Sequence, residues 1–213
     1  MINFSFAVLI SGNGSNLQAM IDAIEEKKIQ GRICCVLSNK ENAYGLIRAK
    51  EVGISTEVVN NENYSTREEF DSKMIEVLAG YQPNLIVLAG FMRILSPIFV
   101  KSYRERILNI HPSLLPKFPG LDTHRRVLES SETRHGVTVH FVDDTLDGGP
   151  ICSQSSILIK TNSPIELKKK IHELEYELYP KVINWFGQGR LTQVKDKVYL
   201  DNKELNIGER NES

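Results

Sequence analysis

Residues 84–90 of this 213-residue chain read NLIVLAG, a nearly continuous apolar run that ends in glycine. Such a run is typical of a strand with both faces covered, because a strand with one solvated face alternates apolar and polar residues. Sheets with two covered faces occur mainly in α/β proteins, where helices connect parallel strands. The stretch therefore predicts a central strand of a parallel sheet.

Strand and helix signals alternate on the N-terminal side of this run. Apolar strands are expected over residues 4–11, 32–38 and 55–60. Apolar residues recur at helical spacing from Leu17 to Ile24, a short helix is expected over residues 43–52, and Thr66 with Glu69 forms the capping box of a further helix. We therefore predict a doubly wound, Rossmann-like N-terminal half with a mostly parallel sheet and right-handed crossovers.

The second half of the chain is less regular and predicts a mixed continuation of the sheet. Ser163 and Pro164 mark a helix start, and Pro180 is expected to bend or restart that helix near residue 178. Residues 194–205 resemble a small exposed hairpin, and residues 207–213 a frayed tail. Further strands are expected over residues 107–110, 136–142 and 151–160, and further helices over residues 97–103 and 123–130.

Composition excludes several classes of protein. Charged residues make up 25% and the formal net charge is -1 with both signs interspersed, so no basic stripe points to nucleic acid. Cys34, Cys35 and Cys152 have no disulfide or metal-ligand spacing and are interpreted as buried thiols of a reducing compartment. The apolar N-terminal run is too short for a signal peptide or a membrane span. We expect a cytoplasmic protein without nucleic-acid or membrane partners.

The stretch SGNGSNLQ, residues 11–18, joins the first expected strand to the first helix. Gly12 and Gly14 permit a tight or left-handed backbone, and Ser15 is expected to cap the helix. Free N–H groups and the helix dipole would then bind an anion at the carboxyl end of the strand. The last glycine of a dinucleotide fingerprint is replaced by Leu17, so a single phosphate is favoured, and an ordinary strand-to-helix turn is the alternative.

Asn109 and His111 lie two residues apart at the end of an apolar strand, and three prolines follow them in ILNIHPSLLPKFPG, residues 107–120. Side chains alternate along a strand, so both residues face the same side. An Asn amide can donate to a developing oxyanion, and a His can shuttle a proton near neutral pH. The alternative is a polar strand end closed by a proline-rich turn.

The stretch VTVHFVDDTLDGGP, residues 137–150, places His140 in a strand and three acids in the turn after it. An acid that reaches His111 would favour its imidazolium form and orient the ring. A solvated turn is the alternative, and the spacing does not fit an EF-hand calcium loop. His124 and His135 occupy polar, loop-like surroundings and are assigned to solvent or structure.

The glycinamide ribonucleotide formyltransferases, a branch of the folate-dependent formyltransferases, resemble this chain in four stretches that occur in the same order, at residues 11–23, 88–97, 109–120 and 137–150. The resemblance extends to about residue 190. It implies the formyltransferase fold and no metal. It also implies transfer of the formyl group of 10-formyltetrahydrofolate to the amine of the ribonucleotide in de novo purine biosynthesis. The stretches are SGNGSNLQAMIDA (11–23), LAGFMRILSP (88–97), NIHPSLLPKFPG (109–120) and VTVHFVDDTLDGGP (137–150).

The resemblance also implies roles for residues at matching positions. Asn109 and His111 would stabilise the oxyanion, Asp147 would favour charged His111 and order a water, and His140 would help to hold the site. The ribonucleotide would contact Gly14, Ser15, Asn16, His172 and Glu175. The folate pocket would be formed by Arg67, Met92, Arg93, Ile94, Leu95, Asn109, Asp143, Asp144 and Asp147.

We expect a single formyltransferase domain, residues 1–213. It would comprise a phosphate-binding half (1–100), a catalytic and folate-binding half (101–190) and a peripheral hairpin and tail (191–213). A monomer or weak homodimer with small-molecule substrates is expected. The nearest alternative is a formyltetrahydrofolate deformylase-like hydrolase, in which the residues after the Asn read His-His-Ser-Phe, where this chain has His111-Pro112-Ser113-Leu114. A phosphate-binding module without catalysis need not combine Asn109, His111 and Asp147.

Overall fold

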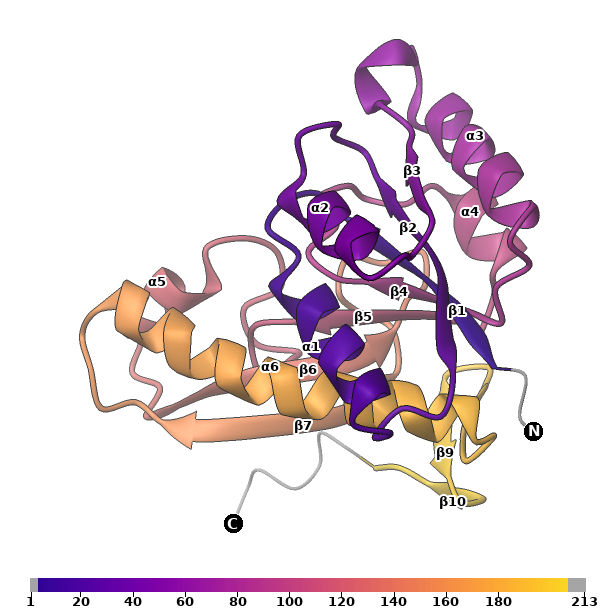
Figure 1. Ribbon diagram of the computed structural model, residues 1–213. Helices are drawn as coiled ribbons and strands as arrows, with labels where there is room; N and C mark the ends of the chain where they lie inside the picture. The colour runs from indigo at the N-terminus through magenta and orange to yellow at the C-terminus, as the bar shows by residue number, and fades with distance from the viewer. Residues whose placement is uncertain (1–3, 207–213) are drawn as a thin grey trace.

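A seven-stranded sheet in the order β3-β2-β1-β4-β5-β6-β7 forms the centre of the computed structural model, which describes residues 4–206 (Figure 1). The five strands from β3 to β5 are parallel, and β6 is antiparallel to both β5 and β7. The predicted parallel half with a mixed continuation is therefore confirmed. The strands are β1 (Ser5–Ile10), β2 (Arg32–Ser38), β3 (Thr56–Val58), β4 (Leu85–Leu88), β5 (Ile107–His111), β6 (Arg134–Phe141) and β7 (Ile151–Leu158).

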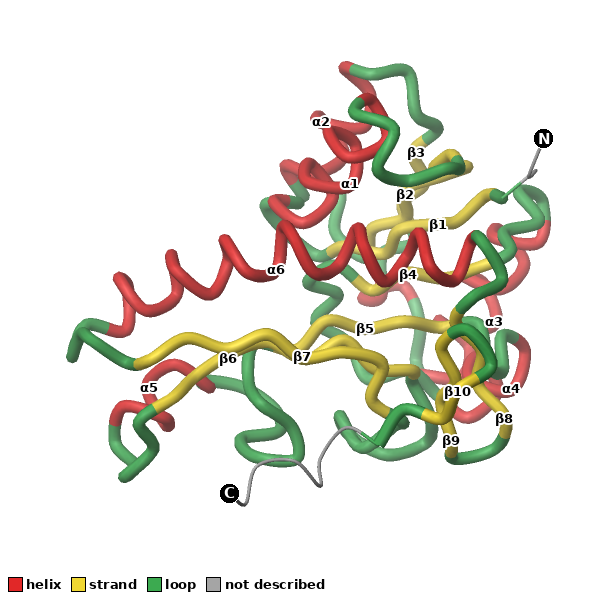
Figure 2. Tube along the Cα trace, turned by 90° about the horizontal axis from the view of Figure 1, so that it is seen from below, coloured by secondary structure: helices red, strands yellow, loops and turns green. Residues whose placement is uncertain are grey.

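Helices cover both faces of this sheet, and each face has its own apolar core (Figure 2). On one face α1, α2 and α6 pack against side chains such as Phe6, Val8 and Val87. On the other face α3 and α4 pack against Leu9, Leu37 and their neighbours. The helices are α1 (Ser15–Glu25), α2 (Tyr44–Glu51), α3 (Arg67–Ala79), α4 (Pro97–Ser102), α5 (Thr123–Leu128) and α6 (Pro164–Gly187), with a 3-10 turn η1 (Asn61–Asn63).

Strand β1 lies between β2 and β4, and the chain winds outward from it in both directions. The crossover through α1 leads to β2 on one side, whereas β4 and β5 follow on the other side. In open α/β sheets, ligands bind at such a switch point, outside the carboxyl ends of the strands. The turns after β1, β4 and β5 therefore face the expected binding crevice.

Local signals for helix starts are confirmed at two positions. The Thr66 hydroxyl accepts from the Glu69 N–H while Glu69 accepts from the Thr66 N–H, which completes the predicted capping box of α3. The Ser163 hydroxyl caps α6 through the Glu166 N–H, with Pro164 in the first turn.

The predicted end of the helix near residue 178 is wrong, because α6 continues through Pro180 to Gly187 without a restart. A proline inside a helix removes one backbone hydrogen bond, and packing must offset that loss. Here Tyr179 is fully buried, and its hydroxyl oxygen lies 3.0 Å from the Leu88 carbonyl and 2.9 Å from that of Leu108. The fit of α6 across β4 and β5 therefore outweighs the local helix-breaking signal.

The expected exposed hairpin is a three-stranded antiparallel sheet formed by β8 (Leu191–Val194), β9 (Lys197–Leu200) and β10 (Lys203–Glu204). Leu191 and Val198 are buried in the larger core, so this sheet is docked rather than free. The predicted tail, residues 207–213, lies outside the described residues.

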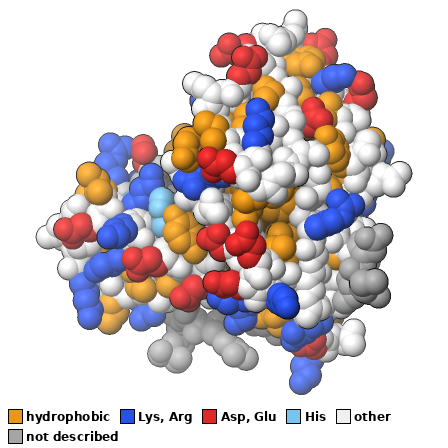
Figure 3. Space-filling model, viewed as in Figure 1, with side chains coloured by type: hydrophobic (Ala, Val, Ile, Leu, Met, Phe, Trp, Pro, Cys, Tyr) orange, Lys and Arg blue, Asp and Glu red, His pale blue; other side chains and the backbone are white. Residues whose placement is uncertain are grey.

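The described residues agree with the charge and cysteine predictions. Acidic and basic side chains are interspersed on the face shown in Figure 3. Cys34, Cys35 and Cys152 are buried free thiols. A search of residues 4–206 for a helix long and apolar enough to cross a membrane found none.

Candidate active site

Asn109 and His111 lie at the carboxyl end of β5, where their side chains meet residues from β6 and from the turn after it. His111 is 5% exposed, and its Nδ1 lies 3.4 Å from Asp147 Oδ2. The other oxygen of Asp147, Oδ1, lies 3.9 Å from His140 Nε2. The fold thus brings the predicted catalytic residues together, and the Asp147 carboxylate lies between the two imidazoles.

His140 orients Asn109. The Asn109 amide Nδ2 lies 3.1 Å from His140 Nε2, while His140 Nδ1 lies 2.8 Å from the Phe141 carbonyl. The carbonyl only accepts, so the hydrogen-bond network assigns the proton to Nδ1 and leaves Nε2 to accept from the amide. Burial lowers the pKa of His140, which favours this neutral form. A neutral His140 therefore fixes the rotation of the Asn109 amide.

Two glycines allow the turn that presents Asp147. Asp147 itself has φ 51°, a left-handed conformation that Asp tolerates better than most residues. A Cβ at Gly148 would collide with the Thr145 side chain, and a Cβ at Gly149 would collide with the Phe141 carbonyl. The LDGGP motif is therefore the sequence this close turn requires.

The segment after β5 folds back over His111 and Asp147. His111 Nε2 lies 2.9 Å from the Phe118 carbonyl, and the Gly120 N–H donates to Asp147 Oδ2 over 2.8 Å. Both nearest partners of the His111 ring are acceptors, so a ring with a proton on each nitrogen satisfies both contacts. Through these two bonds the proline-rich stretch forms one wall of the site.

Gly14 shapes the turn between β1 and α1. It has φ 73°, and a Cβ there would lie 2.6 Å from the Gly45 Cα, so both the conformation and the space require glycine. The Gly45 N–H donates to the Gly12 carbonyl over 3.1 Å, and the Arg48 side chain donates to the Asn13 carbonyl over 3.0 Å. Helix α2 thus holds this turn, the phosphate loop (residues 11–16), from its outer side.

The phosphate loop leaves backbone donors available. Among residues 4–206, no acceptor receives a hydrogen bond from the N–H groups of Asn13, Gly14, Ser15 or Asn16. The prediction that Ser15 caps α1 is wrong, because Gly14 occupies the N-cap position and no side chain caps the helix. Free N–H groups at the positive end of a helix form a site suited to phosphate.

A hydrogen bond between Asn16 of α1 and Glu175 of α6 joins segments that lie far apart in the sequence. The Asn16 amide donates to Glu175 Oε2 over 2.9 Å, and the Asn16 Oδ1 is buried without a partner among the described residues. Burial raises the pKa of Glu175 to about 7, although the bond from Asn16 opposes the shift. His172, one turn earlier on α6, is half-buried and packs beside the Tyr176 ring.

The candidate folate residues after β4 form an irregular segment. Met92 is 64% exposed and Ile94 is 59% exposed, whereas Leu95 is buried and Arg93 lies exposed between them. Exposed apolar side chains in a row are typical of a binding wall.

The other candidate folate residues lie on two separate segments. In the turn after β6, Asp143 Oδ1 accepts from the Thr145 N–H, and Asp144 is exposed. Arg67 lies in the first turn of α3, 3.5 Å from Glu68. Within residues 4–206 no hydrogen bond or salt bridge joins it to Met92–Leu95, so its folate role stays a prediction.

The placement of His124 and His135 in loop-like surroundings is wrong for both residues: His124 lies in helix α5, and the error is larger for His135. This residue lies in β6 and is 1% exposed, and its Nε2 lies 3.0 Å from His124 Nδ1. Burial lowers the pKa of both rings to about 4, so both are neutral at neutral pH. The pair is a structural contact between α5 and β6.

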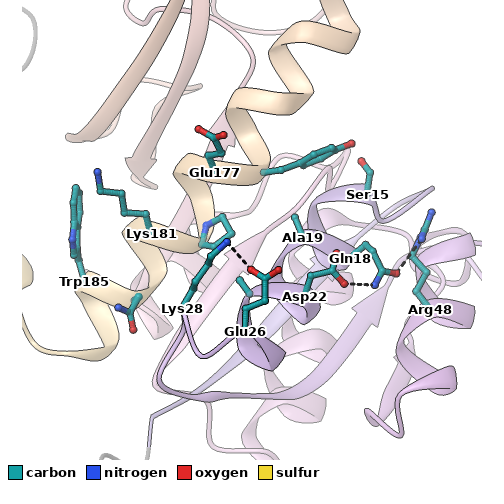
Figure 4. A pocket seen from close by; sticks show the side chains of 14 residues that line it. Ser15, Gln18, Ala19, Asp22, Glu26, Lys28, Arg48, Glu177, Lys181 and Trp185 are labelled. Carbon is teal, nitrogen blue, oxygen red and sulfur yellow. Dashed lines mark hydrogen bonds and ion pairs between the residues drawn. The ribbon is translucent and has the colours of Figure 1, made fainter.

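A groove of about 760 Å³ lies between α1 and α6 (Figure 4). It is lined by polar and aromatic side chains such as Asp22, Lys28, Lys181 and Trp185, but by none of the candidate catalytic residues. We place the chemistry at the strand ends, because there a carboxylate, two imidazoles and an amide converge. In residues 4–206 no group of three or more His, Cys, Asp or Glu side chains is arranged to hold a metal ion.

Several contributors to the site were not predicted. The Ser11 hydroxyl accepts from the Met92 N–H, and the Phe118 carbonyl contacts His111. The Gly120 N–H donates to Asp147, and the buried Asp71 carboxylate accepts from the Ser96 N–H. Only Asp71 had a visible signal. It occupies an apolar stripe of α3 with Met74 and Leu78, where a charge is unexpected.

Comparison with known proteins gives consistent matches. Residues 4–183 match the family described as formyl transferase. The chain is 48% identical over 202 residues to phosphoribosylglycinamide formyltransferase of Escherichia coli (strain K12), which covers 94% of this chain and 95% of that protein. The Haemophilus influenzae protein of the same name is 46% identical over 200 residues, covering 93% and 94%. The structure of phosphoribosylglycinamide formyltransferase from Coxiella burnetii in complex with CHES matches with a TM-score of 0.92 and 47% identity, covering 96% and 97%.

Proposed function

The chain belongs to the formyl transferase family, and we propose that Asn109, His111 and Asp147 carry its reaction. The chain is a one-carbon group transferase of purine biosynthesis. It transfers the formyl group of a folate to the amine of N1-(5-phospho-D-ribosyl)glycinamide. The folate is 10-formyltetrahydrofolate, which leaves as tetrahydrofolate. The observation that carries the assignment of residues is the Asp147 carboxylate placed between His111 and His140.

The reaction needs charge stabilisation and one proton relay. The amine lone pair attacks the formyl carbon, and the carbonyl electrons move onto the oxygen to give a tetrahedral oxyanion. When the carbonyl re-forms, the bond from carbon to folate N10 breaks. The attacking nitrogen loses one proton and N10 gains one, so the site must stabilise an anion and move a proton.

Asn109 and His111 supply the two donors. His140 Nε2 takes one N–H of the Asn109 amide, which leaves the second N–H to donate to the oxyanion. His111 Nε2 donates to the Phe118 carbonyl in this structure, so this hydrogen bond must break for the imidazole to donate its proton to the reacting group during turnover. One neutral donor and one proton-carrying donor thus act from the same strand end.

Asp147 keeps His111 in its working orientation. Its carboxylate is largely buried, with 12% of the side chain exposed, so its interaction with the imidazolium is screened less than at the surface. The Gly120 N–H holds Oδ2 in place, which fixes the carboxylate against the ring. Water ordered by the same carboxylate would accept the proton that the amine loses.

The ribonucleotide would bind between the phosphate loop and α6. The N–H groups of Gly14, Ser15 and Asn16 are free to bind the phosphate. Glu175 and His172 lie on α6, and Glu175 already contacts Asn16, so a ribose above the phosphate loop would meet α6. The folate would pack on Met92 and its neighbours, with the turn of Asp143 and Asp144 closing over its ring. Arg67 is retained as an outer folate contact.

Three broader assignments complete the proposal. We retain a single domain with a phosphate-binding half, a catalytic half and a docked C-terminal sheet. The proposed binding partners are the two small-molecule substrates, the ribonucleotide and the formyl-folate. We expect the protein to be a monomer or a weak homodimer. The cytoplasm remains the proposed compartment, because three buried free thiols suit a reducing environment.

The direct test supplies the protein with both substrates and follows tetrahydrofolate formation. Turnover is expected only when the ribonucleotide is present. Release of the folate without the ribonucleotide would identify a deformylase-like hydrolase instead. No turnover under either condition would contradict the assigned reaction.

A further inference from the structure

The segment from Gly90 to Ser96 joins β4 to α4 without regular secondary structure of its own. It exposes the apolar side chains of Met92 and Ile94, and removing apolar surface from water is favourable. Their position cannot come from a strand ladder or from helical hydrogen bonds. The buried side chains of Phe91 and Leu95, together with the groups that fix the two ends of this segment, therefore decide where these side chains lie.

Ser11 fixes the first end. Its side chain is buried, and the hydroxyl accepts from the Met92 N–H over 2.8 Å while it donates to Asn39 Oδ1 over 2.6 Å. The Ser11 N–H also donates to the Gly90 carbonyl over 3.2 Å. The start of the segment is thus bound to the end of β1.

Asp71 fixes the second end from α3. Its Oδ2 accepts from the Ser96 N–H over 2.5 Å, and both residues are 0% exposed. Among the described residues, Asp71 Oδ1 and the Ser96 hydroxyl have no hydrogen-bond partner, and Asp71 forms no salt bridge. Burial raises the pKa of Asp71, although the hydrogen bond from the Ser96 N–H and the positive charge of Arg67 oppose the rise.

A buried carboxylate that has no salt-bridge partner is costly in a folded protein. An apolar side chain at this position of the α3 stripe would continue the pattern of Met74 and Leu78 and avoid that cost. The carboxylate instead accepts a hydrogen bond from the backbone N–H of Ser96, the residue directly after Met92–Leu95. Its placement is therefore better explained by the segment than by the core.

We propose that Asp71 is a positioning residue for the folate substrate: its bond to the Ser96 N–H holds Met92–Leu95 in the conformation that receives the folate ring. The inference rests on the proposed function, which makes this segment a folate wall. Asp71 does not touch the substrate. It acts through the backbone, so its loss should weaken folate binding while the ribonucleotide site is spared.

The test compares the KM values of both substrates in Asp71→Leu, which keeps nearly the same shape but removes both oxygens. The KM for 10-formyltetrahydrofolate should rise about 10-fold, because the buried Ser96 N–H loses its acceptor. The KM for the ribonucleotide should stay within about 2-fold. Asp71→Asn retains an acceptor of the same shape and should restore the folate KM to within about 3-fold of wild type.

Met74→Ala is the matched control, since it loosens the same face of α3 one turn away without a bond to the segment. It should lower the melting temperature and leave the folate KM unchanged. If Asp71→Leu does not fold, Asp71→Ala is measured in the same way. Folate KM values equal to wild type in folded Asp71→Leu or Asp71→Ala would overturn the proposal, as would equal losses in Asp71→Asn and Asp71→Leu. Failure of the proposed function is distinct, because wild-type protein would then show no ribonucleotide-dependent turnover.

Discussion

Asp147 and Gly14 both have left-handed backbones, with φ 51° and 73°, and both lie where the chain turns beside a candidate substrate position. They differ in what the site uses. At Asp147 the turn presents a side chain, whose oxygens lie near two imidazoles and accept from a backbone N–H. At Gly14 the turn works because no side chain is present, since a Cβ would meet Gly45 and the backbone N–H groups are the donors.

The turn of Asp147 and the turn of Gly14 should therefore control different kinetic constants. Side chains that stabilise charge in the transition state affect the chemical step, whereas backbone donors for a phosphate that does not react contribute binding in both ground and transition states. The catalytic cluster should therefore affect kcat, and the phosphate loop should affect the KM for the ribonucleotide.

The largest effect is expected from Asp147→Asn. The change removes the negative charge beside His111 and His140 but preserves shape, so kcat should fall by about 10²–10⁴-fold, the range of general acid–base catalysis. Steady-state kinetics at saturating substrates would measure it, with the melting temperature as a check on folding. Asp196→Asn, in an exposed turn of the small C-terminal sheet, is the matched control. A kcat within a few-fold of wild type would remove Asp147 from the mechanism.

Asn109→Ala should follow, with kcat lower by about 10²–10³-fold, as for the loss of one oxyanion donor. Asn109→Asp separates donation from shape, because the carboxylate occupies the same space but cannot donate when ionised. Both variants should be impaired to a similar degree in single-turnover measurements. If Asn109→Asp retained most of the activity, donation by this side chain would not be needed.

Gly14→Ala should have a smaller effect, and on a different constant. Left-handed strain and the contact with Gly45 should distort the loop at a cost of about 1–3 kcal/mol, which raises the KM for the ribonucleotide by about 10-fold or more. The kcat should change little. Gly53→Ala is the matched control, since Gly53 also has φ 73° but a Cβ there would meet no neighbouring atom within 4 Å. A loss of kcat without a change of KM in Gly14→Ala would break the comparison.

Glu175→Gln should give the smallest of these effects, and the effect should appear in the pH dependence of stability. The folded-state pKa of about 7 lies above the ordinary value of 4.5, so wild type binds more protons folded than unfolded between these values. The contribution of Glu175 is therefore fully present below about pH 4.5 and is lost as the pH rises through 7. It amounts to at most about 3 kcal/mol, at 1.36 kcal/mol per pKa unit.

The melting temperature of wild type should accordingly fall relative to Glu175→Gln as the pH rises from 4.5 to 7. Glu173→Gln, an exposed change on the same helix, should follow the wild-type profile. Parallel profiles for wild type and Glu175→Gln would show that Glu175 is not the source of the pH dependence.

The repeating parts of the fold were predictable from sequence because their signals are local. The buried run of β4 and the capping box of Thr66 need only a few neighbouring residues to be read. The continuation of α6 through Pro180 was not predictable, since it depends on Tyr179 reaching the carbonyls of two strands. The start of α1 was misread for a similar reason, because Gly14 adopts its conformation against Gly45.

The site was predictable in part. Strand alternation alone placed Asn109 and His111 on one side, but only the family resemblance joined Asp147 to them across 36 positions of the sequence. No local pattern shows that the Phe118 carbonyl meets His111 or that His135 is buried against His124. Such contacts depend on tertiary folding, and a backbone carbonyl such as that of Phe118 is present whatever the residue is.

The bond between Asn16 and Glu175 has a consequence for how the protein comes to be made. The phosphate loop leaves the ribosome well before α6, which would complete the ribose side and is the last helix of the described residues. Because ligand stabilises only the state that binds it, nucleotide in the cell would favour finished molecules over partly synthesised ones. The enzyme's own substrate would thus act on its folding only once nearly all of the sheet and α6 are in place.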